Sequence, residues 1–116
     1  MNLRNVVGGE LVDAVDGATR EILNPATGQP IATVPEGGEA DVRRAVAAAS
    51  EAFEGGWRLA TPAMRSEALL ALADLLMELD EELAGLESAN VGKPLAQARE
   101  ENEVSADNLR FFAAAA

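Results

Sequence analysis

The sequence has 116 residues, enough for one modest domain, and its 20 acidic and nine basic side chains give a formal net charge of −11. This charge repels phosphate groups, so we expect neither nucleic acid nor an anionic membrane as a partner. The sequence contains no cysteine and no histidine, which excludes disulfides, a thiolate nucleophile and the commonest metal ligand within these residues. We expect a cytoplasmic protein, because no apolar run approaches the ~20 residues that span a bilayer and the start lacks the apolar core of a secretion signal.

Two β-hairpins are predicted within about residues 4–35. The first joins Asn5–Val7 to Leu11–Val12 around Gly8-Gly9, since paired glycines supply the positive φ of a tight turn. The second joins Arg20–Leu23 to Pro30–Val34. We expect these strands to form one small sheet, which needs a helical cover to be stable.

About four α-helices are predicted over residues 39–116. The first begins at Glu39 and ends near the Gly55-Gly56 pair. Thr61 and Pro62 mark the start of the second, as a capping side chain followed by proline at the first helical position. A third helix ends at Gly92, and Pro94 opens the fourth. The predicted fold class is therefore α/β, with short hairpins followed by helices.

The apolar periodicity of the first two helices predicts which side chains form the core. We also expect Trp57, between these helices, to lie in the core. The apolar faces are Val42, Ala45, Val46, Ala49 and Phe53 in the first helix, and Ala68, Leu72, Leu75, Leu76 and Leu79 in the second.

The apolar run at the end of the fourth helix has no helix stop signal. Leu109, Phe111, Phe112 and the alanines through Ala116 are followed by no Gly, Asn or Pro. We therefore expect a helix that continues beyond this sequence, in a larger protein.

Two features of the last thirty residues have competing interpretations. The Gly92-Lys93 pair is similar to a phosphate loop, but Pro94 replaces the Ser or Thr that would hold magnesium, so a helix boundary is favoured. The acidic cluster Glu100, Glu101, Glu103 and Asp107 is interpreted mainly as a solvated helix face, with Arg99 pairing to Glu103 and Arg110 to Asp107. The sharper alternative is that one carboxylate binds a cationic ligand.

One succession of residues runs through most of the chain: Asn24-Pro25-Ala26-Thr27-Gly28, Asp41 to Phe53, Trp57, Arg65, Leu86-Glu87-Ser88 and Gly92-Lys93-Pro94. In order and spacing, this succession resembles the amino-terminal segment of NAD(P)-dependent aldehyde dehydrogenases. Within that family, Glu87 to Pro94 and Asn108 to Ala113 are most similar to the γ-aminobutyraldehyde branch of aminoaldehyde and betaine aldehyde dehydrogenases. Asn90 stands where many relatives have Asp.

The resemblance implies that residues 1–116 are an incomplete piece of a Rossmann-like cofactor domain. The complete enzyme would oxidise an (amino)aldehyde such as 4-aminobutanal to its acid with NAD or NADP, and would be a homo-oligomer. Its cysteine nucleophile, catalytic glutamate and cofactor-binding residues would lie outside these residues, so we expect no catalytic residue here, no cofactor bound to this chain and no turnover by the chain alone.

Two sites follow from the resemblance. Glu101 matches an acidic position that binds the substrate ammonium in aminoaldehyde-oxidising relatives, and burial of an ammonium does require a carboxylate. Backbone oxygens near Ile22 and Leu23 match a monovalent cation site of other relatives. The alternative function is a non-catalytic module that associates through the apolar end, Phe111-Phe112.

Overall fold

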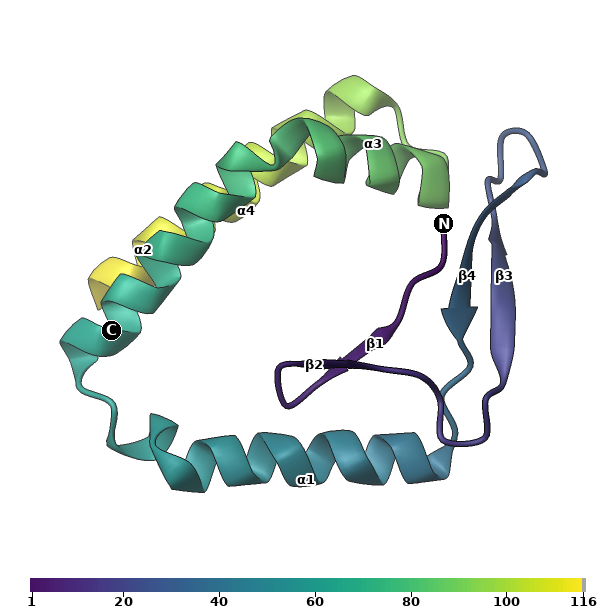
Figure 1. The fold of residues 1–116 in the computed structure, drawn as a ribbon. Coiled ribbons are helices and arrows are strands. Elements are labelled where there is room, and N and C mark those ends of the chain that lie inside the picture. Colours follow the sequence, from purple (N-terminus) through teal and green to yellow (C-terminus); the bar gives the residue numbers. More distant parts are fainter. Residues whose placement is uncertain (116) are drawn as a thin grey trace. The chain divides into compact units, whose positions relative to one another are not determined.

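Two antiparallel hairpins begin the chain (Figure 1). β1 (Asn5–Val7) pairs with β2 (Glu10–Val12), and β3 (Thr19–Leu23) pairs with β4 (Pro30–Pro35). Between β1 and β2, Gly8 and Gly9 have φ of 62° and 84°, as both central residues of a two-residue hairpin turn require. Both predicted hairpins are thus confirmed in this computed structural model, which describes residues 1–115.

The expectation of one small sheet was wrong, because the two hairpins form separate two-stranded sheets. The chain start, rather than β1 or β2, lies along β4. Leu3 N–H donates to the Thr33 carbonyl at 2.9 Å, and Thr33 N–H donates to the Met1 carbonyl at 2.9 Å. These bonds occupy the edge of β4 that does not face β3, so the first hairpin cannot extend the second sheet there.

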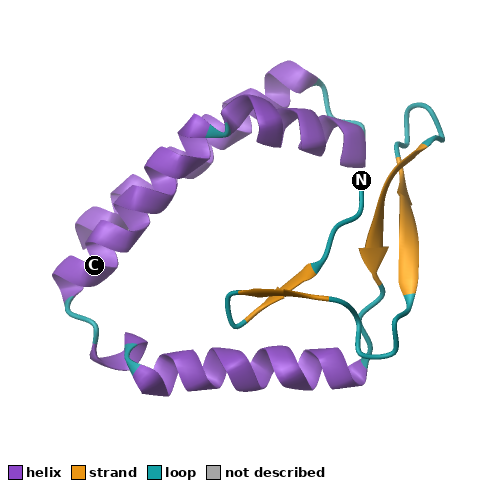
Figure 2. Ribbon diagram, in the orientation of Figure 1, coloured by secondary structure: helices purple, strands orange, loops and turns teal. Residues whose placement is uncertain are grey.

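The predicted helices are present (Figure 2). At the start of α2, Pro62 is the first helical residue and Thr61 Oγ1 accepts a hydrogen bond from Met64 N–H at 3.3 Å, as predicted. Within residues 1–115, no helix combines the length and apolar character needed to cross a membrane. The last helix reaches Ala115; its expected continuation through Ala116 lies outside the described residues. The elements are α1 (Glu39–Gly55), the 3-10 helix η1 (Trp57–Leu59), α2 (Pro62–Glu78), α3 (Asp80–Val91) and α4 (Leu95–Ala115).

The chain divides into two compact units, Met1–Leu59 and Ala60–Ala116. The second unit is a helical hairpin in which α4 lies beside α2 and also packs on α3 (Figure 1). Its most buried side chains are all small: Ala73, Ala84, Ala98, Ala106 and Ala113.

These alanines correct the expected leucine core. Leu72 and Leu75 remain 50% and 49% exposed, whereas Ala73, Ala98 and Ala106 are at most 1% exposed. The reason is that α4 presents the small residues Ala98, Ala106 and Ala113, about two helical turns apart, on its packed face. Short side chains let the two helices approach closely, and the longer leucines flank the contact.

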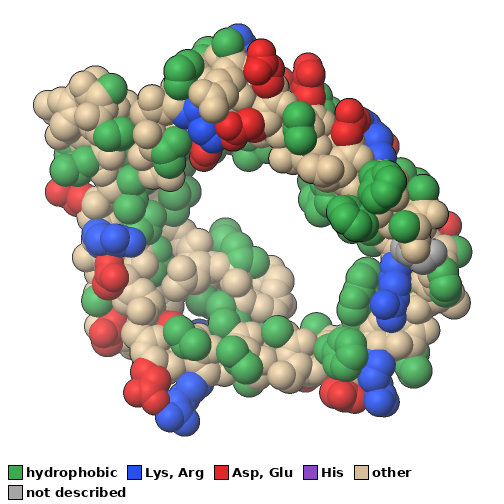
Figure 3. Space-filling model, turned by 180° about the vertical axis from the view of Figure 1, so that it is seen from behind, with side chains coloured by type: hydrophobic (Ala, Val, Ile, Leu, Met, Phe, Trp, Pro, Cys, Tyr) green, Lys and Arg blue, Asp and Glu red, His purple; other side chains and the backbone are tan. Residues whose placement is uncertain are grey.

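The first unit has a smaller core, formed by Ala14 and Ala32. No residue of α1 is buried, and Val42 and Val46 are about 60% exposed. Trp57 is 49% exposed rather than in the core as expected. Within this unit α1 contacts β1 and η1, elements of three residues each that cannot cover its apolar face. Figure 3 shows hydrophobic side chains on the surface of each unit.

Candidate functional site

The candidate site lies in the second unit, where α3 ends and α4 begins. Gly92 has φ 75° and ψ 17°, a left-handed cap, and its N–H donates to the Ser88 carbonyl at 3.0 Å. The Pro94 carbonyl then accepts the first bond of α4, from Ala98 N–H at 3.1 Å. Glycine adopts this conformation without the strain that other residues incur. The predicted helix boundary is confirmed, and it places Lys93 in a tight turn.

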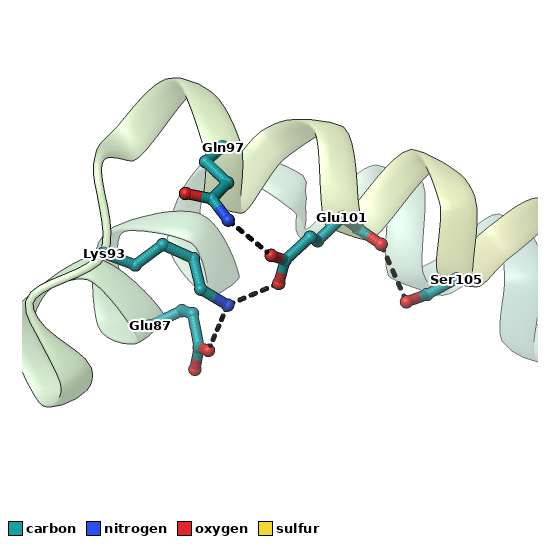
Figure 4. Close-up of polar contacts among 5 residues, drawn as sticks. All are labelled: Glu87, Lys93, Gln97, Glu101 and Ser105. Carbon is teal, nitrogen blue, oxygen red and sulfur yellow. Dashed lines mark hydrogen bonds and ion pairs between the residues drawn. The ribbon is translucent and has the colours of Figure 1, made fainter.

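The Lys93 ammonium lies between two carboxylates from different helices (Figure 4). Nζ is 2.8 Å from Glu87 Oε1 of α3, and it also donates to Glu101 Oε2 of α4. An ammonium has three donors and no acceptor, so two carboxylate oxygens are suitable partners for it. The three side chains therefore join α3, the turn and α4.

The Glu101 carboxylate is held at both oxygens. Gln97, one helical turn earlier, donates from Nε2 to Glu101 Oε1 at 3.1 Å. One turn later, Ser105 Oγ donates to the Glu101 backbone carbonyl at 2.7 Å, a bond that serines commonly make within helices. The carboxylate thus has a defined orientation although it is on the surface (Figure 4).

Electrostatics and exposure differ among the three charged groups. The Lys93 side chain is 19% exposed, whereas Glu87 and Glu101 are 43% and 49% exposed. Hydrogen bonds to Glu101 and then to Glu87 raise the pKa of Lys93 above its ordinary value. The bond from Lys93 lowers the pKa of Glu101, with a smaller contribution from Gln97. With Lys93 and both glutamates ionised, the cluster has a formal charge of −1.

The remaining members of the acidic face are paired differently from the prediction. Arg99 does not pair with Glu103: its Nε and Nη2 donate to Glu81 Oε1 and Oε2 at 2.9 and 2.8 Å. Glu81, in the first turn of α3, offers the two-bond geometry that matches a guanidinium, and this lowers the pKa of Glu81.

The predicted pairing of Arg110 is confirmed. Its Nη1 lies 3.2 Å from Asp107 Oδ1, and its Nη2 also lies 3.4 Å from Asp74 Oδ1 of α2. The bond to Asp74 ties α4 to α2.

The predicted cation site near Ile22 and Leu23 lies in the first unit, on β3. Ile22 is opposite Ala32 and Leu23 is opposite Pro30, with a register irregularity between the two pairs. Among residues 1–115, no three acidic, histidine or cysteine side chains converge as a metal site would require. The cation role of these backbone oxygens stays a prediction.

Besides the pairs of Arg99 with Glu81 and Arg110 with Asp74, sequence reasoning missed two polar contacts of α4. One is the bridge from Lys93, and the other is Asn102, whose Nδ2 donates to Asp80 Oδ1 at 2.7 Å and to the Asp80 carbonyl at 3.3 Å. A signal for the second was available, because Asn102 falls between Ala98 and Ala106 on an otherwise apolar face. For the first, Lys93 is the only lysine of the chain, and it stands six residues after Glu87 and eight before Glu101.

Comparison with known proteins identifies the family. The family model described as the aldehyde dehydrogenase family matches residues 12–116. The chain belongs to the aldehyde dehydrogenase family. "Aldehyde dehydrogenase 1" of Tanacetum cinerariifolium is 45% identical to it over 112 residues, covering 95% of this chain and 22% of that protein. A glutarate-semialdehyde dehydrogenase of Pseudomonas putida is 41% identical over 107 residues, covering 92% and 22%.

Solved aldehyde dehydrogenase structures have the same fold in this segment. An NAD-dependent aldehyde dehydrogenase from Sinorhizobium meliloti is 41% identical, with a TM-score of 0.94 over 98% of this chain and 23% of that one. A point mutant of betaine aldehyde dehydrogenase from Staphylococcus aureus, in complex with NAD+, is 36% identical with a TM-score of 0.91 over 96% and 22%. The predicted fold class is confirmed, as an amino-terminal piece of this α/β fold. The chain spans about a fifth of the length of these aldehyde dehydrogenases.

Proposed function

We propose that this chain is part of an oxidoreductase that oxidises an aldehyde to its carboxylic acid with NAD or NADP. The observation that carries the proposal is the family match over residues 12–116. The sequence has no cysteine, so the thiol nucleophile that the resemblance implies has to come from residues outside this chain. In the complete enzyme, a bound nicotinamide cofactor would supply the hydride acceptor for this oxidation.

The residues of this chain do not themselves fit the cofactor. The sequence has no G-x-G-x-x-G run, and Gly8-Gly9 forms a hairpin turn between β1 and β2. Gly37-Gly38 does lie between a strand and a helix, but Asp41 of the first turn of α1 accepts a hydrogen bond from the Gly38 N–H. This turn therefore presents a carboxylate where a dinucleotide pyrophosphate would need free N–H donors. Lys93 donates to Glu87 and Glu101. We therefore assign this chain a part in substrate binding and in the scaffold.

The substrate class that we propose is an aminoaldehyde such as 4-aminobutanal, whose ammonium would bind Glu101. The Glu101 carboxylate is half exposed and already holds one alkylammonium, that of Lys93. The amino end of 4-aminobutanal is also a primary alkylammonium. Betaine aldehyde dehydrogenase, which is among the structural relatives, is named for another cationic aldehyde.

The test uses the complete reading frame that contains residues 1–116, assayed by formation of the reduced cofactor. Glu101→Gln is expected to raise KM for 4-aminobutanal about tenfold and to leave KM for butanal nearly unchanged, because it removes a charge-assisted hydrogen bond to the ammonium. Glu103→Gln, an exposed neighbour on α4, is the matched control. Equal effects of Glu101→Gln on both aldehydes would rule out the ammonium site, and a reading frame without a cysteine would rule out the enzyme.

Three further parts of the proposal rest on the family resemblance. We propose that the complete enzyme is a cytoplasmic homo-oligomer and that residues 1–116 belong to its cofactor domain. We also propose that backbone oxygens near Ile22 and Leu23 bind a monovalent cation in it. Potassium-dependent thermal stability of the complete enzyme, compared with choline as the replacement cation, tests the last point.

The second candidate function is a non-catalytic module that associates through the end of α4. Phe111 and Phe112 are 68% and 60% exposed, and their rings lie edge to face with centroids 5.3 Å apart. Exposed aromatic pairs favour association. Sedimentation of the 116-residue chain tests this candidate: a self-associating chain that becomes monomeric in Phe111→Ser/Phe112→Ser supports it, and a monomeric parent chain contradicts it.

A further inference from the structure

The Lys93 bridge has a consequence for substrate selection, which rests on the proposed binding of an ammonium at Glu101. We propose that Glu87 and Lys93 are positioning residues that set the selectivity for cationic aldehydes, by fixing the net charge around the Glu101 carboxylate. Neither side chain needs to contact the substrate for this effect.

The geometry places an internal cation at the proposed binding group. Lys93 Nζ occupies Oε2 of Glu101, and the Gln97 amide donates to Oε1 at 3.1 Å. The Lys93 side chain is 19% exposed while that of Glu101 is 49% exposed. An arriving ammonium therefore meets a carboxylate whose charge is already shared with a lysine that solvent reaches much less.

Glu87 restores the attraction that Lys93 removes. Lys93 and Glu101 together have a formal charge of zero, and a neutral pair attracts a cation weakly. Glu87 Oε1 lies 2.8 Å from the same ammonium and brings the cluster to −1. One unit of charge about 6 Å away in a largely aqueous setting changes the affinity for a monovalent cation about threefold. Loss of the charge at Glu87 and loss of the charge at Lys93 should thus shift the selectivity for 4-aminobutanal over butanal in opposite directions.

The experiment compares KM for 4-aminobutanal with KM for butanal in the complete enzyme at low ionic strength. Glu87→Gln keeps an amide oxygen for Lys93 to bind and brings the cluster to zero, so the ratio of KM for 4-aminobutanal to KM for butanal is expected to rise about threefold. Lys93→Met brings the cluster to −2, and the ratio is expected to fall about threefold. The double variant has a charge of −1 again and is expected to return near the parent ratio.

Glu82→Gln is the matched control, because Glu82 is an exposed residue of α3 with the same charge. It is expected to leave the ratio unchanged, and 0.5 M salt is expected to reduce the shifts of the two single variants. A fall of the ratio in Glu87→Gln, a rise in Lys93→Met, or shifts of both aldehydes alike would overturn the proposal. If Lys93→Met does not fold, the sign of the Glu87→Gln shift still decides.

A second test needs no enzyme turnover, because Lys93 is the only lysine of this chain. With ¹³C-lysine labelling, NMR follows Lys93 as the one side-chain ammonium of this chain. In Glu87→Gln its pKa is expected to fall toward the ordinary lysine value, because one of its two carboxylate partners has lost its charge. An unchanged pKa would show that the two groups are not coupled and would overturn the proposal. Equal responses of both aldehydes to Glu101→Gln would instead overturn the proposed ammonium site.

Discussion

The two units of the chain are stabilised in different ways. The helical unit buries five alanines in the contacts of α2, α3 and α4 and adds polar contacts between helices, such as Arg99 with Glu81. The hairpin unit buries Ala14 and Ala32, and its helix α1 has no buried residue. Apolar residues are concentrated on one face more strongly in α1 than in α2, so the difference lies in whether the unit supplies a partner helix for that face. Periodicity alone therefore does not make a core.

The largest expected effect is overpacking of the α2–α4 contact. Ala106 is 0% exposed, so Ala106→Leu places three further carbons where no space exists and should lower the free energy of unfolding of the helical unit by about 1–3 kcal/mol. Urea unfolding followed by circular dichroism measures it. Ala47→Leu, on the exposed surface of α1, is the control and should change stability by less than about 0.5 kcal/mol. Equal losses of unfolding free energy in Ala106→Leu and Ala47→Leu would contradict the difference between the two units.

The next largest effect is expected in the hairpin unit, where Asp41 joins α1 to the preceding segment by hydrogen bonds. Asp41 accepts hydrogen bonds from Gly38 N–H, at the start of α1, and from Val15 N–H, both at 3.0 Å. Asp41→Ala leaves both donors unpaired and should cost about 1 kcal/mol, as loss of a helix cap does. Faster amide exchange at residues 15 and 38 would show this, whereas Glu51→Ala on the exposed face of α1 should leave both amides protected.

A smaller effect is expected from pH at the α3–α4 turn. The folded-state pKa of Lys93 is raised, so its contribution is present below the ordinary lysine pKa and is lost as pH rises through the raised value. The folded-state pKa of Glu101 is lowered, so its contribution is present above the ordinary glutamate pKa and is lost as pH falls through the lowered value. Thermal unfolding across pH should show a plateau between these limits. In Lys93→Met the loss of thermal stability at alkaline pH should be smaller than in the parent chain. An unchanged loss at alkaline pH would contradict the contribution of Lys93.

The smallest effect is expected for the pair of Glu39 and Arg43 on α1. Their side chains are each 79% exposed and lie one helical turn apart, with Arg43 Nη2 2.6 Å from Glu39 Oε1. Exposed pairs of this kind contribute at most about 0.5 kcal/mol. Glu39→Gln should therefore shift the urea midpoint by less than Asp41→Ala does, and a larger shift would contradict this ranking.

The sequence predicted the local features of the fold because each depends on a few adjacent residues. Gly8-Gly9 marked the first hairpin, Thr61-Pro62 the start of α2 and Gly92 the end of α3. It did not predict the separation of the two sheets or the exposure of Trp57. Those depend on which elements meet in space, and a hydrophobic pattern does not contain that information.

For the candidate site, the sequence identified a residue but not its environment. Glu101 was named from the family resemblance, and the partner that holds its carboxylate, Lys93, was interpreted as part of a helix boundary only. The pairing requires the left-handed turn at Gly92, which directs the chain so that Glu87, six positions before Lys93, and Glu101, eight positions after it, share its ammonium. Spacing along a single helix could not predict a contact made across a turn.

The two carboxylates that bind the Lys93 ammonium also affect how this chain reacts with acylating reagents. An amine attacks an activated ester only after it has lost its proton, and the two carboxylates hold that proton on Lys93 through their hydrogen bonds. Acylation of Lys93 by amine-directed labels should therefore be slow, and it should become faster in Glu87→Gln, where one of the two acceptors has lost its charge.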